Sequence, residues 1–185
     1  MRLSENRKLA WVVLAACVLG SVVGLGGGHL VRERGAIEEM FYEGVGSNTS
    51  RESMDAYLDR AYDCAQVMAS EAQLHFGADD APAAKMFDAL ASFGDDAGLD
   101  ARYEAYKELQ GLSDQLYNQF YAEGVADADR VNFKRAYDDF WGADKFVHRD
   151  AYRAWARDFN DGLKGFPAGA VAGLLGVDEL NSFGA

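Results

Sequence analysis

The chain has 185 residues, of which 49% are hydrophobic and 12% aromatic, so it can build the core of an ordinary domain and is not globally disordered. Its formal net charge of −12, without any cluster of Lys and Arg, argues against nucleic acid as a partner, because such binding depends on contacts to phosphates. With two cysteines and two prolines, a disulfide framework is excluded and long helices are favoured over a turn-rich β fold.

The chain opens with an apolar run from Leu9 to Gly28. These twenty residues carry no charge, and a helix of about 20 apolar residues spans the hydrocarbon core of a bilayer. We therefore expect a transmembrane anchor over residues 9–31. Basic residues flank it with a slight excess on the N-terminal side, which makes residues 1–8 a cytoplasmic tail and places residues 32–185 outside the cytoplasm.

Two other interpretations of this run stay open. The residues Leu14 to Cys17 read LAAC and look like a bacterial lipobox, which would make Cys17 the lipidated residue of a lipoprotein. The small residues before His29 would instead suit the end of a cleaved signal peptide, although no clear Ala-x-Ala site is present. We favour the uncleaved single-pass anchor, because the chain stays apolar for eleven residues after Cys17, where a lipoprotein usually turns polar.

Small residues recur every four positions in this run, at Ala16, Gly20, Gly24 and Gly28. Such a stripe contains overlapping G-x-x-x-G units, which let two membrane helices approach closely. Gly20, Gly24 and Gly28 are therefore candidates for a contact between the membrane helices of a homodimer. The alternative interpretation is that small residues are common in membrane helices and mark no contact.

The remaining chain, residues 32–185, carries 15 basic and 29 acidic residues, and its net charge of −14 keeps it soluble and away from anionic lipid headgroups. No segment alternates with the period of a strand, whereas several carry one apolar stripe at helical spacing. Such helices bury their stripes against each other, so we expect an all-α protein with an antiparallel bundle of four to five helices after the membrane helix. The expected helices run from a capping box at Thr49–Glu52 to Gly77, from Pro82 to Gly94, from Asp100 to near Gly124, from Asp127 or Asp129 to Gly142, and from Asp144 to Pro167.

Spacings of three and four residues predict which side chains of these helices face the core. Each stripe combines aromatic residues with leucine, methionine or alanine. The inward residues are expected to be Leu58, Tyr62, Ala65, Ala69, Ala72 and Phe76; Met86, Phe87, Leu90 and Phe93; Ala105, Leu109, Leu112, Leu116 and Phe120; Phe133, Tyr137 and Phe140; and Tyr152, Trp155, Phe159 and Leu163.

The sequence contains no recognisable pattern for catalysis or cofactor binding. His29, His75 and His148 stand far apart and belong to no metal-ligand motif. Cys64 is expected to be an inert buried thiol, because no neighbour in the sequence is placed to activate it. The acidic segment Asp127–Asp138 fails as a calcium loop, since it lacks the central glycine and the final glutamate. We therefore expect no enzyme and no cofactor.

The C-terminal segment carries an ordered motif. An aromatic-Asn pair is followed by Phe-Pro, with the second Phe seven residues after the first aromatic, and then by Ala, Gly and a final Phe. The motif residues are Phe159, Asn160, Phe166, Pro167, Ala172, Gly176 and Phe183. This order resembles the closing signature of the LemA family. The resemblance implies long antiparallel helices on a membrane anchor and no established enzymatic activity.

A second signature of that family is reduced here. In LemA proteins the second helix carries an Arg-Arg pair and Asp-Leu followed by Pro-Asn, whereas this chain reads RAYDCAQV, in which Arg60 and Asp63 remain. The chain thus resembles a divergent member, and roles tied to the missing residues do not carry over.

The residues of the C-terminal motif also have a physical interpretation. Pro167 disfavours helix at Phe166 and ends the last long helix. We expect residues 168–176 to fold back as a short apolar helix that covers the open end of the bundle. Phe159 should belong to the core, and Asn160 should fix the packing by bonding a polar group of another segment.

These features together predict a membrane-anchored helical scaffold or interaction protein of the cell envelope, with the lipid bilayer and an unknown envelope protein as its partners. The alternative is an extracytoplasmic receptor that binds a divalent cation or a small ligand in a bundle cavity or on acidic turns. The acidic pairs that could gather a cation, rather than being merely solvated, are Asp79-Asp80, Asp95-Asp96 and Asp138-Asp139.

Overall fold

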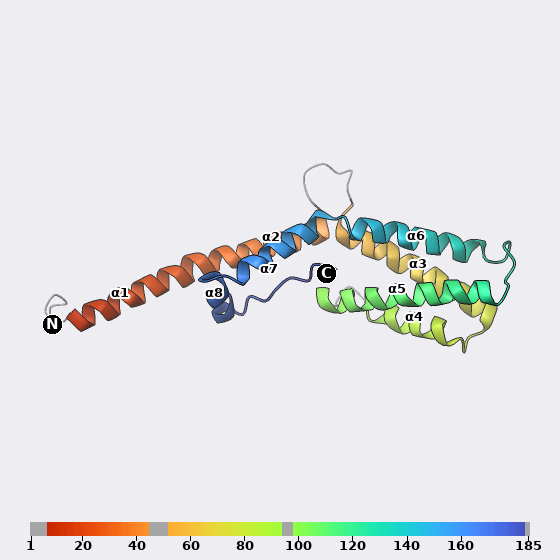
Figure 1. Cartoon of the computed structure of the whole chain (residues 1–185), viewed down its shortest axis with the longest axis horizontal. Coiled ribbons are helices and arrows are strands. Elements are labelled where there is room, and N and C mark those ends of the chain that lie inside the picture. Colours follow the sequence, from red (N-terminus) through yellow and green to blue (C-terminus); the bar gives the residue numbers. More distant parts are fainter. Residues whose placement is uncertain (1–6, 45–51, 94–97, 184–185) are drawn as a thin grey trace. The chain divides into compact units, whose positions relative to one another are not determined.

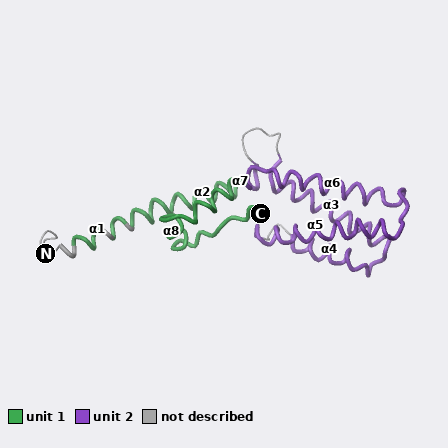
Figure 2. Tube along the Cα trace, viewed as in Figure 1, with its two compact units in different colours: residues 1–40, 154–182 green, residues 41–153, 183–185 purple. Residues whose placement is uncertain are grey.

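The described part of the chain is mostly helical. The computed structural model describes residues 7–44, 52–93 and 98–183, and within these ranges it contains helices and turns but no strand. The expected all-α class is therefore confirmed. The chain divides into two compact units: unit 1 comprises residues 1–40 and 154–182, and unit 2 comprises residues 41–153 and 183–185 (Figure 2).

Unit 1 is built on one long N-terminal helix. The helix α1 (Arg7–Ser21), the π-helical turn η2 (Val22–Gly26) and α2 (Gly27–Glu43) follow one another without a break (Figure 1). The described part Ala10–Glu43 is long and apolar enough to cross a membrane, a property that signal sequences share, and only 6% of its most apolar window is buried. The expected apolar helix is thus present, and it continues beyond residue 31, where we expected the anchor to end.

The C-terminal segments of the chain complete unit 1. They are the part of α7 (Ala151–Leu163) from Ala154 onward, α8 (Ala168–Leu175) and a tail that extends to Ser182. The short helix α8 contacts η2, so its apolar side chains pack on the long N-terminal helix. The expectation that residues 168–176 cover the end of the bundle is therefore wrong.

Unit 2 contains the remaining helices, which pack through their apolar stripes. Helix α3 lies mainly against α6 and α4, and α5 lies against α4 with further contacts to α3 and α6. Successive helices run in opposite directions (Figure 1). Their bounds are Met54–Phe76 for α3, Ala81–Ala91 for α4, Leu99–Ala122 for α5 and Val131–Val147 for α6.

Most of the predicted core residues of unit 2 are buried. Every inward residue expected on α5 is buried, and Phe133 and Phe140 of α6 are buried too. Four aromatic residues that were expected to face inward are only partly covered, namely Tyr62, Phe76, Phe87 and Tyr137. The other buried side chains that the stripes predicted are Leu58, Ala65, Ala69, Ala72, Met86, Leu90 and Phe93.

Two helices of unit 2 begin with side-chain caps, and the cap of α3 differs from the expected one. Ser53, rather than Thr49, caps α3, and its Oγ accepts a hydrogen bond from the Ala56 amide at 3.2 Å; Thr49 lies outside the described residues. Asp80 caps α4, with its Oδ2 accepting from the Ala83 amide at 3.1 Å. Pro82 lies in the first turn of α4 as expected, because its missing amide costs nothing there.

The expected break at Gly142 is wrong, since α6 runs without interruption through Gly142 and Asp144. Asp144 does not cap a new helix. It is buried within α6 and accepts hydrogen bonds from Tyr106 and Gln110 of α5. These partners come from a distant segment of the chain. The expected caps of α6, Asp127 and Asp129, are also wrong, because the residue before this helix is Arg130 and its side chain makes no capping hydrogen bond.

Helix α7 buries a different face from the one expected at Trp155. Tyr152, Phe159 and Leu163 are buried as predicted, but the Trp155 side chain is 50% exposed and Ala156 is buried in its place. The buried positions therefore follow one another at intervals of four, three and four. Trp155 lies beside this stripe, and its size made it a misleading indicator of the inward face.

Candidate functional site

The first candidate site is the exposed apolar surface of the N-terminal helix. Trp11 is 70% exposed and Leu25 is 80% exposed. A Cβ added at Gly20, Gly24 or Gly28 would meet no atom within 4 Å, so the small-residue stripe forms an open face of the helix. The structure thus leaves the stripe free for a second helix, and whether one binds there stays a prediction.

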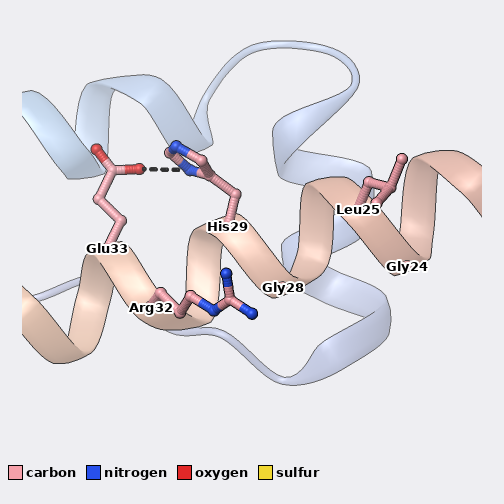
Figure 3. Close-up of a pocket in the computed structure, with 6 residues that line it drawn as sticks. All are labelled: Gly24, Leu25, Gly28, His29, Arg32 and Glu33. Carbon is pink, nitrogen blue, oxygen red and sulfur yellow. Dashed lines mark ion pairs between the residues drawn. The ribbon is translucent and has the colours of Figure 1, made fainter.

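After the apolar run, polar side chains begin at His29, two residues before the expected end of the anchor. A shallow hollow on the helix is lined by Gly24 and Gly28 and then by His29, Arg32 and Glu33 (Figure 3). His29 Nδ1 lies 3.3 Å from Glu33 Oε2, one turn further along the same helix. This change from glycine and leucine to charged residues marks the end of the apolar surface.

The second candidate site is a contact that we call the C-terminal clasp, formed by Asn160 and Arg34 with the backbone of the tail. Asn160 Nδ2 donates to the Leu180 carbonyl at 2.7 Å, and the Leu180 amide donates to Asn160 Oδ1 at 2.8 Å. Arg34 Nε donates to the Asp178 carbonyl at 3.4 Å, and its guanidinium pairs with Glu38 at 2.7 Å. A carboxamide has an NH₂ group that donates and an oxygen that accepts, so Asn160 satisfies both backbone groups of the buried Leu180.

The residues of the C-terminal motif do not gather at one place. Asn160 contacts the tail, whereas Phe159 and Ala172 are buried within unit 1, each 4% exposed. Gly176 ends α8 with a φ of 67°, a left-handed conformation that glycine adopts without strain. Phe166 is 92% exposed, and Pro167 is also exposed.

The last motif residue, Phe183, belongs to unit 2. It is 1% exposed, and its ring contacts Phe41 at a centroid distance of 5.4 Å and Tyr103 at 5.2 Å. The motif residues therefore have separate roles: Asn160 bonds the tail, Phe159 and Ala172 are buried, Gly176 ends α8, and Phe183 packs among aromatic rings of unit 2. Residues distributed in this way do not form a single binding site.

Unit 2 contains a buried cation that the sequence analysis missed. Arg102 is 3% exposed and donates to Asp55 and, at 3.0 Å, to Asp59, both on α3. Its guanidinium also lies 4.9 Å from the centre of the Phe93 ring. Its position in the sequence could have indicated this burial, because Arg102 lies three residues before Ala105 and seven before Leu109 and so belongs to the apolar stripe of α5.

A buried carboxylate forms a second polar cluster in unit 2. Asp144 Oδ1 accepts from Tyr106 Oη and from Gln110 Nε2, both at 2.6 Å, and His148 Nε2 lies 3.3 Å away. Burial, followed by the hydrogen bond to Asp144, raises the pKa of Tyr106 well above its ordinary value. The phenol therefore stays a hydrogen-bond donor, and the cluster ties α5 to α6 rather than supplying a base.

Cys64 lies in a groove of about 360 Å³ between α3 and α6. Burial, with smaller contributions from the Asp139 and Asp63 carboxylates, raises the pKa of Cys64 to about 11. A thiol that stays protonated at neutral pH is a poor nucleophile, in keeping with the expected inert role. The groove is lined by Asp63, Cys64, Val67, Glu71, Asn132, Arg135, Ala136 and Asp139.

The candidate cation ligands have other partners. Asp80 accepts from the Ala83 amide and, at 2.7 Å, from Gln119, and Asp138 pairs with Lys134 at 2.6 Å. Asp95-Asp96 lies outside the described residues. Within residues 7–44, 52–93 and 98–183, no three His, Cys, Asp or Glu side chains gather in a way that could hold a metal ion.

Comparisons of the chain with protein-family models, with curated proteins and with solved structures gave no match. The similarity to the LemA family therefore rests on the C-terminal motif alone.

Proposed function

We propose that this protein is a single-pass membrane protein whose acidic helical bundle acts outside the cytoplasm as a scaffold or interaction module of the cell envelope, without catalysing a reaction. One observation carries the proposal: the most apolar window of the N-terminal helix is long enough to cross a bilayer, and only 6% of it is buried. Exposed apolar surface of this extent is unfavourable in water and favourable in lipid.

Two features support the assignment of the bundle to binding rather than to chemistry. The two buried charged residues in the described part of the bundle have structural partners, since Arg102 pairs with Asp55 and Asp144 accepts a hydrogen bond from Tyr106. Its surface carries much of the net charge of −14 of residues 32–185, which favours cationic partner surfaces through electrostatic steering. The partner we propose is an envelope protein with a basic face.

The similarity to the LemA family supports the same proposal. A divergent LemA protein is expected to have an antiparallel bundle of long helices on an N-terminal anchor. The bidentate contact of Asn160 with Leu180 gives the Asn of the motif a structural role, since it fastens the tail to α7. The missing Arg-Arg and Pro-Asn residues are the reason to treat the protein as divergent.

Alkaline extraction of membranes that contain the full chain tests the anchor. We expect the protein to stay in the membrane pellet and its intact mass to match a chain that begins at Met1 or Arg2. A mass that corresponds to a lipidated N-terminal Cys17 would establish the lipoprotein. A terminus within or after the glycines that end at Gly28 would establish a cleaved signal peptide.

The glycine stripe provides a test of homodimer formation through the membrane helix. Replacing Gly20 and Gly24 by Ile should weaken self-association in a bilayer reporter, because bulky side chains keep the helix backbones apart. The matched control replaces Leu14 and Val18, which lie two residues from the stripe positions and are each 53% exposed, by Ile. An equal dimer signal in all variants would show that the glycine stripe makes no contact between helices and only reflects the composition of membrane helices.

Crosslinking in native membranes, followed by capture of the full chain, tests the scaffold role. We expect an envelope protein to be captured, and the yield to fall when acidic residues on the bundle surface are replaced by their amides. Capture that is unchanged by these replacements would contradict an electrostatic scaffold.

The second candidate function is a receptor for a divalent cation or a small ligand. The observation in its favour is the groove of about 360 Å³ at Cys64, whose lining includes Asp63, Glu71 and Asp139, although these carboxylates do not converge as the ligands of a metal ion do. A ligand that binds only the native state stabilises it by mass action. A saturable rise in the melting temperature with calcium or magnesium, lost on Glu71→Gln, would favour the receptor over the scaffold.

A further inference from the structure

Helix α8 lies in an uncharged stretch of the chain. From Gly165 to Val177 no residue carries a charge, and the stretch is bounded by Lys164 and Asp178. It is the longest uncharged segment after the N-terminal run. A surface helix of a water-soluble protein ordinarily has a charged face, which α8 lacks.

One side of α8 contacts the N-terminal helix within unit 1. A Cβ at Gly27 would lie 2.2 Å from Leu175 Cδ1 and 3.4 Å from Val171 Cγ1, so these two side chains lie against the backbone of the long helix at Gly27. Gly27 is buried as a result. The level of α8 along the long helix is therefore fixed by a close contact.

The other side of the same region is apolar and uncovered. Leu174 is 73% exposed, and Phe166, in the turn before α8, is 92% exposed. On the long helix, two residues before the contact with α8, Leu25 is 80% exposed. We call Leu174 and Phe166 the exposed patch of α8, because large apolar side chains in this position are not favoured by water. Leu25 lies about half a turn from Gly27 and thus on another face of the long helix.

The contact with Gly27 places α8 at the outer end of the proposed span. Leu9 to Gly28 is a run of twenty residues, and a helix of that length covers about 30 Å, the thickness of the hydrocarbon core. Gly27 is thus at the outer boundary of the core. The polar residues that follow agree with this depth, because His29 and Glu33 pair one turn later and Arg34 holds the tail at Asp178.

We propose that α8 and Phe166 insert into the outer leaflet of the membrane beside the anchor, at the boundary between the acyl chains and the headgroups. The occupant of the exposed patch is lipid. The uncharged sequence of α8, its fixed level at Gly27 and the exposure of Leu174 and Phe166 together carry this proposal, which rests on the proposed membrane anchor. Aromatic and leucine side chains are the residues that interfacial helices bury.

The experiment places an environment-sensitive fluorophore on single cysteines of the full chain in vesicles of phosphatidylcholine and phosphatidylglycerol. The background carries Cys17→Ser and Cys64→Ser, and the labelled variants are Leu174→Cys in α8, Val13→Cys in the anchor and Leu74→Cys in α3. Quenching is compared between nitroxides on lipid acyl chains near the headgroup and iodide in the water. Circular dichroism checks that each variant keeps its helix content.

We expect the label at Leu174 to be quenched about threefold more by the lipid nitroxide than by iodide, and the label at Leu74, which is 80% exposed on unit 2, to show the opposite ratio. A Leu174 label that behaves like Leu74 overturns the proposal. A Leu174 label shielded from both quenchers also overturns it, because protein would then cover the patch.

The label at Val13 distinguishes failure of the α8 proposal from failure of the membrane anchor. Strong quenching by lipid at Val13 together with iodide quenching at Leu174 would refute the insertion of α8 and leave the anchor intact. Iodide quenching at both positions would refute the anchor itself.

Discussion

Helices α1 and α5 contain similar numbers of apolar residues but distribute them differently around the helix. In α5 the buried residues follow one stripe, including Leu109, Leu112 and Leu116, and charged residues cover the rest. In α1 apolar residues surround the helix, and Trp11 and Leu14 are 70% and 53% exposed. The comparison teaches that the angular spread of apolar residues, more than their number, decides whether a helix packs against protein or requires lipid.

The largest expected effect is on the exposed apolar helix. Leu14→Arg combined with Val18→Arg places two charges near the middle of the span, at a cost of about 5 kcal/mol for insertion. We expect the variant to leave the membrane pellet during alkaline extraction. The control Leu74→Arg, at an exposed apolar position of α3, should change the stability of the bundle by less than about 0.5 kcal/mol. A double variant that stays in the pellet would contradict the anchor.

The next effect compares two aromatics on one helix, since Phe159 of α7 is 4% exposed and Trp155 is 50% exposed. Phe159→Ala removes a buried ring and should lower the free energy of unfolding by about 3–5 kcal/mol. Trp155→Ala should cost less than about 1.5 kcal/mol, although the sequence pattern treats both residues as inward. Urea unfolding of the full chain in detergent measures both values, and equal losses would refute the assigned face of α7.

A smaller loss is expected at the clasp. Asn160→Ala leaves the amide and carbonyl of the buried Leu180 without their partner and should cost about 1–3 kcal/mol. Asp161→Ala, at the exposed neighbouring position, is the matched control. Proteolysis of the C-terminal tail provides a second measurement, and it should become faster in the Asn160 variant alone. If stability were unchanged while capture of an envelope partner was lost, Asn160 would belong to a binding surface instead.

The smallest effect concerns pH and the groove in unit 2. Because the pKa of Cys64 is raised from 9.0 to about 11, the folded state holds the thiol proton more tightly than the unfolded state does. This contribution to stability is fully present below pH 9 and is lost as the pH rises from 9 toward 11. Cys64→Ala should flatten the loss of melting temperature over this range. Alkylation of Cys64 that is as fast as that of a free thiol at pH 8 would contradict the raised pKa.

The sequence predicted the features that depend on local pattern. The stripe of α5, the end of α3 at Gly77 and the apolar N-terminal helix follow from spacing and from glycine chemistry. The predicted break at Gly142 was wrong. Local sequence rules made Asp144 a helix N-cap, but it instead accepts hydrogen bonds from Tyr106 and Gln110, which are 38 and 34 residues away. Only tertiary structure supplies those partners.

The candidate sites show the same division. Asn160 was predicted to bond a polar group of another segment, but its partner is the backbone of Leu180, which no side-chain pattern reveals. Arg102 was missed because a charged residue within an apolar stripe is usually interpreted as the end of the buried face. Its pairing with Asp55 becomes visible only when α3 and α5 lie side by side. Contacts that join distant segments are the part that composition and spacing do not encode.

The contact between Arg34 and Asp178 has a consequence for the order of biosynthesis, because it joins positions 144 residues apart. A chain leaves the ribosome from its amino end, so the N-terminal helix is complete long before α8 has been translated. The proposed insertion of this helix into the bilayer therefore precedes its contact with α8 at Gly27. The main contact of the bundle, between α3 and α6, forms only after α6 has been synthesised. The segments that complete unit 1, from Ala154 to Ser182, are synthesised later still.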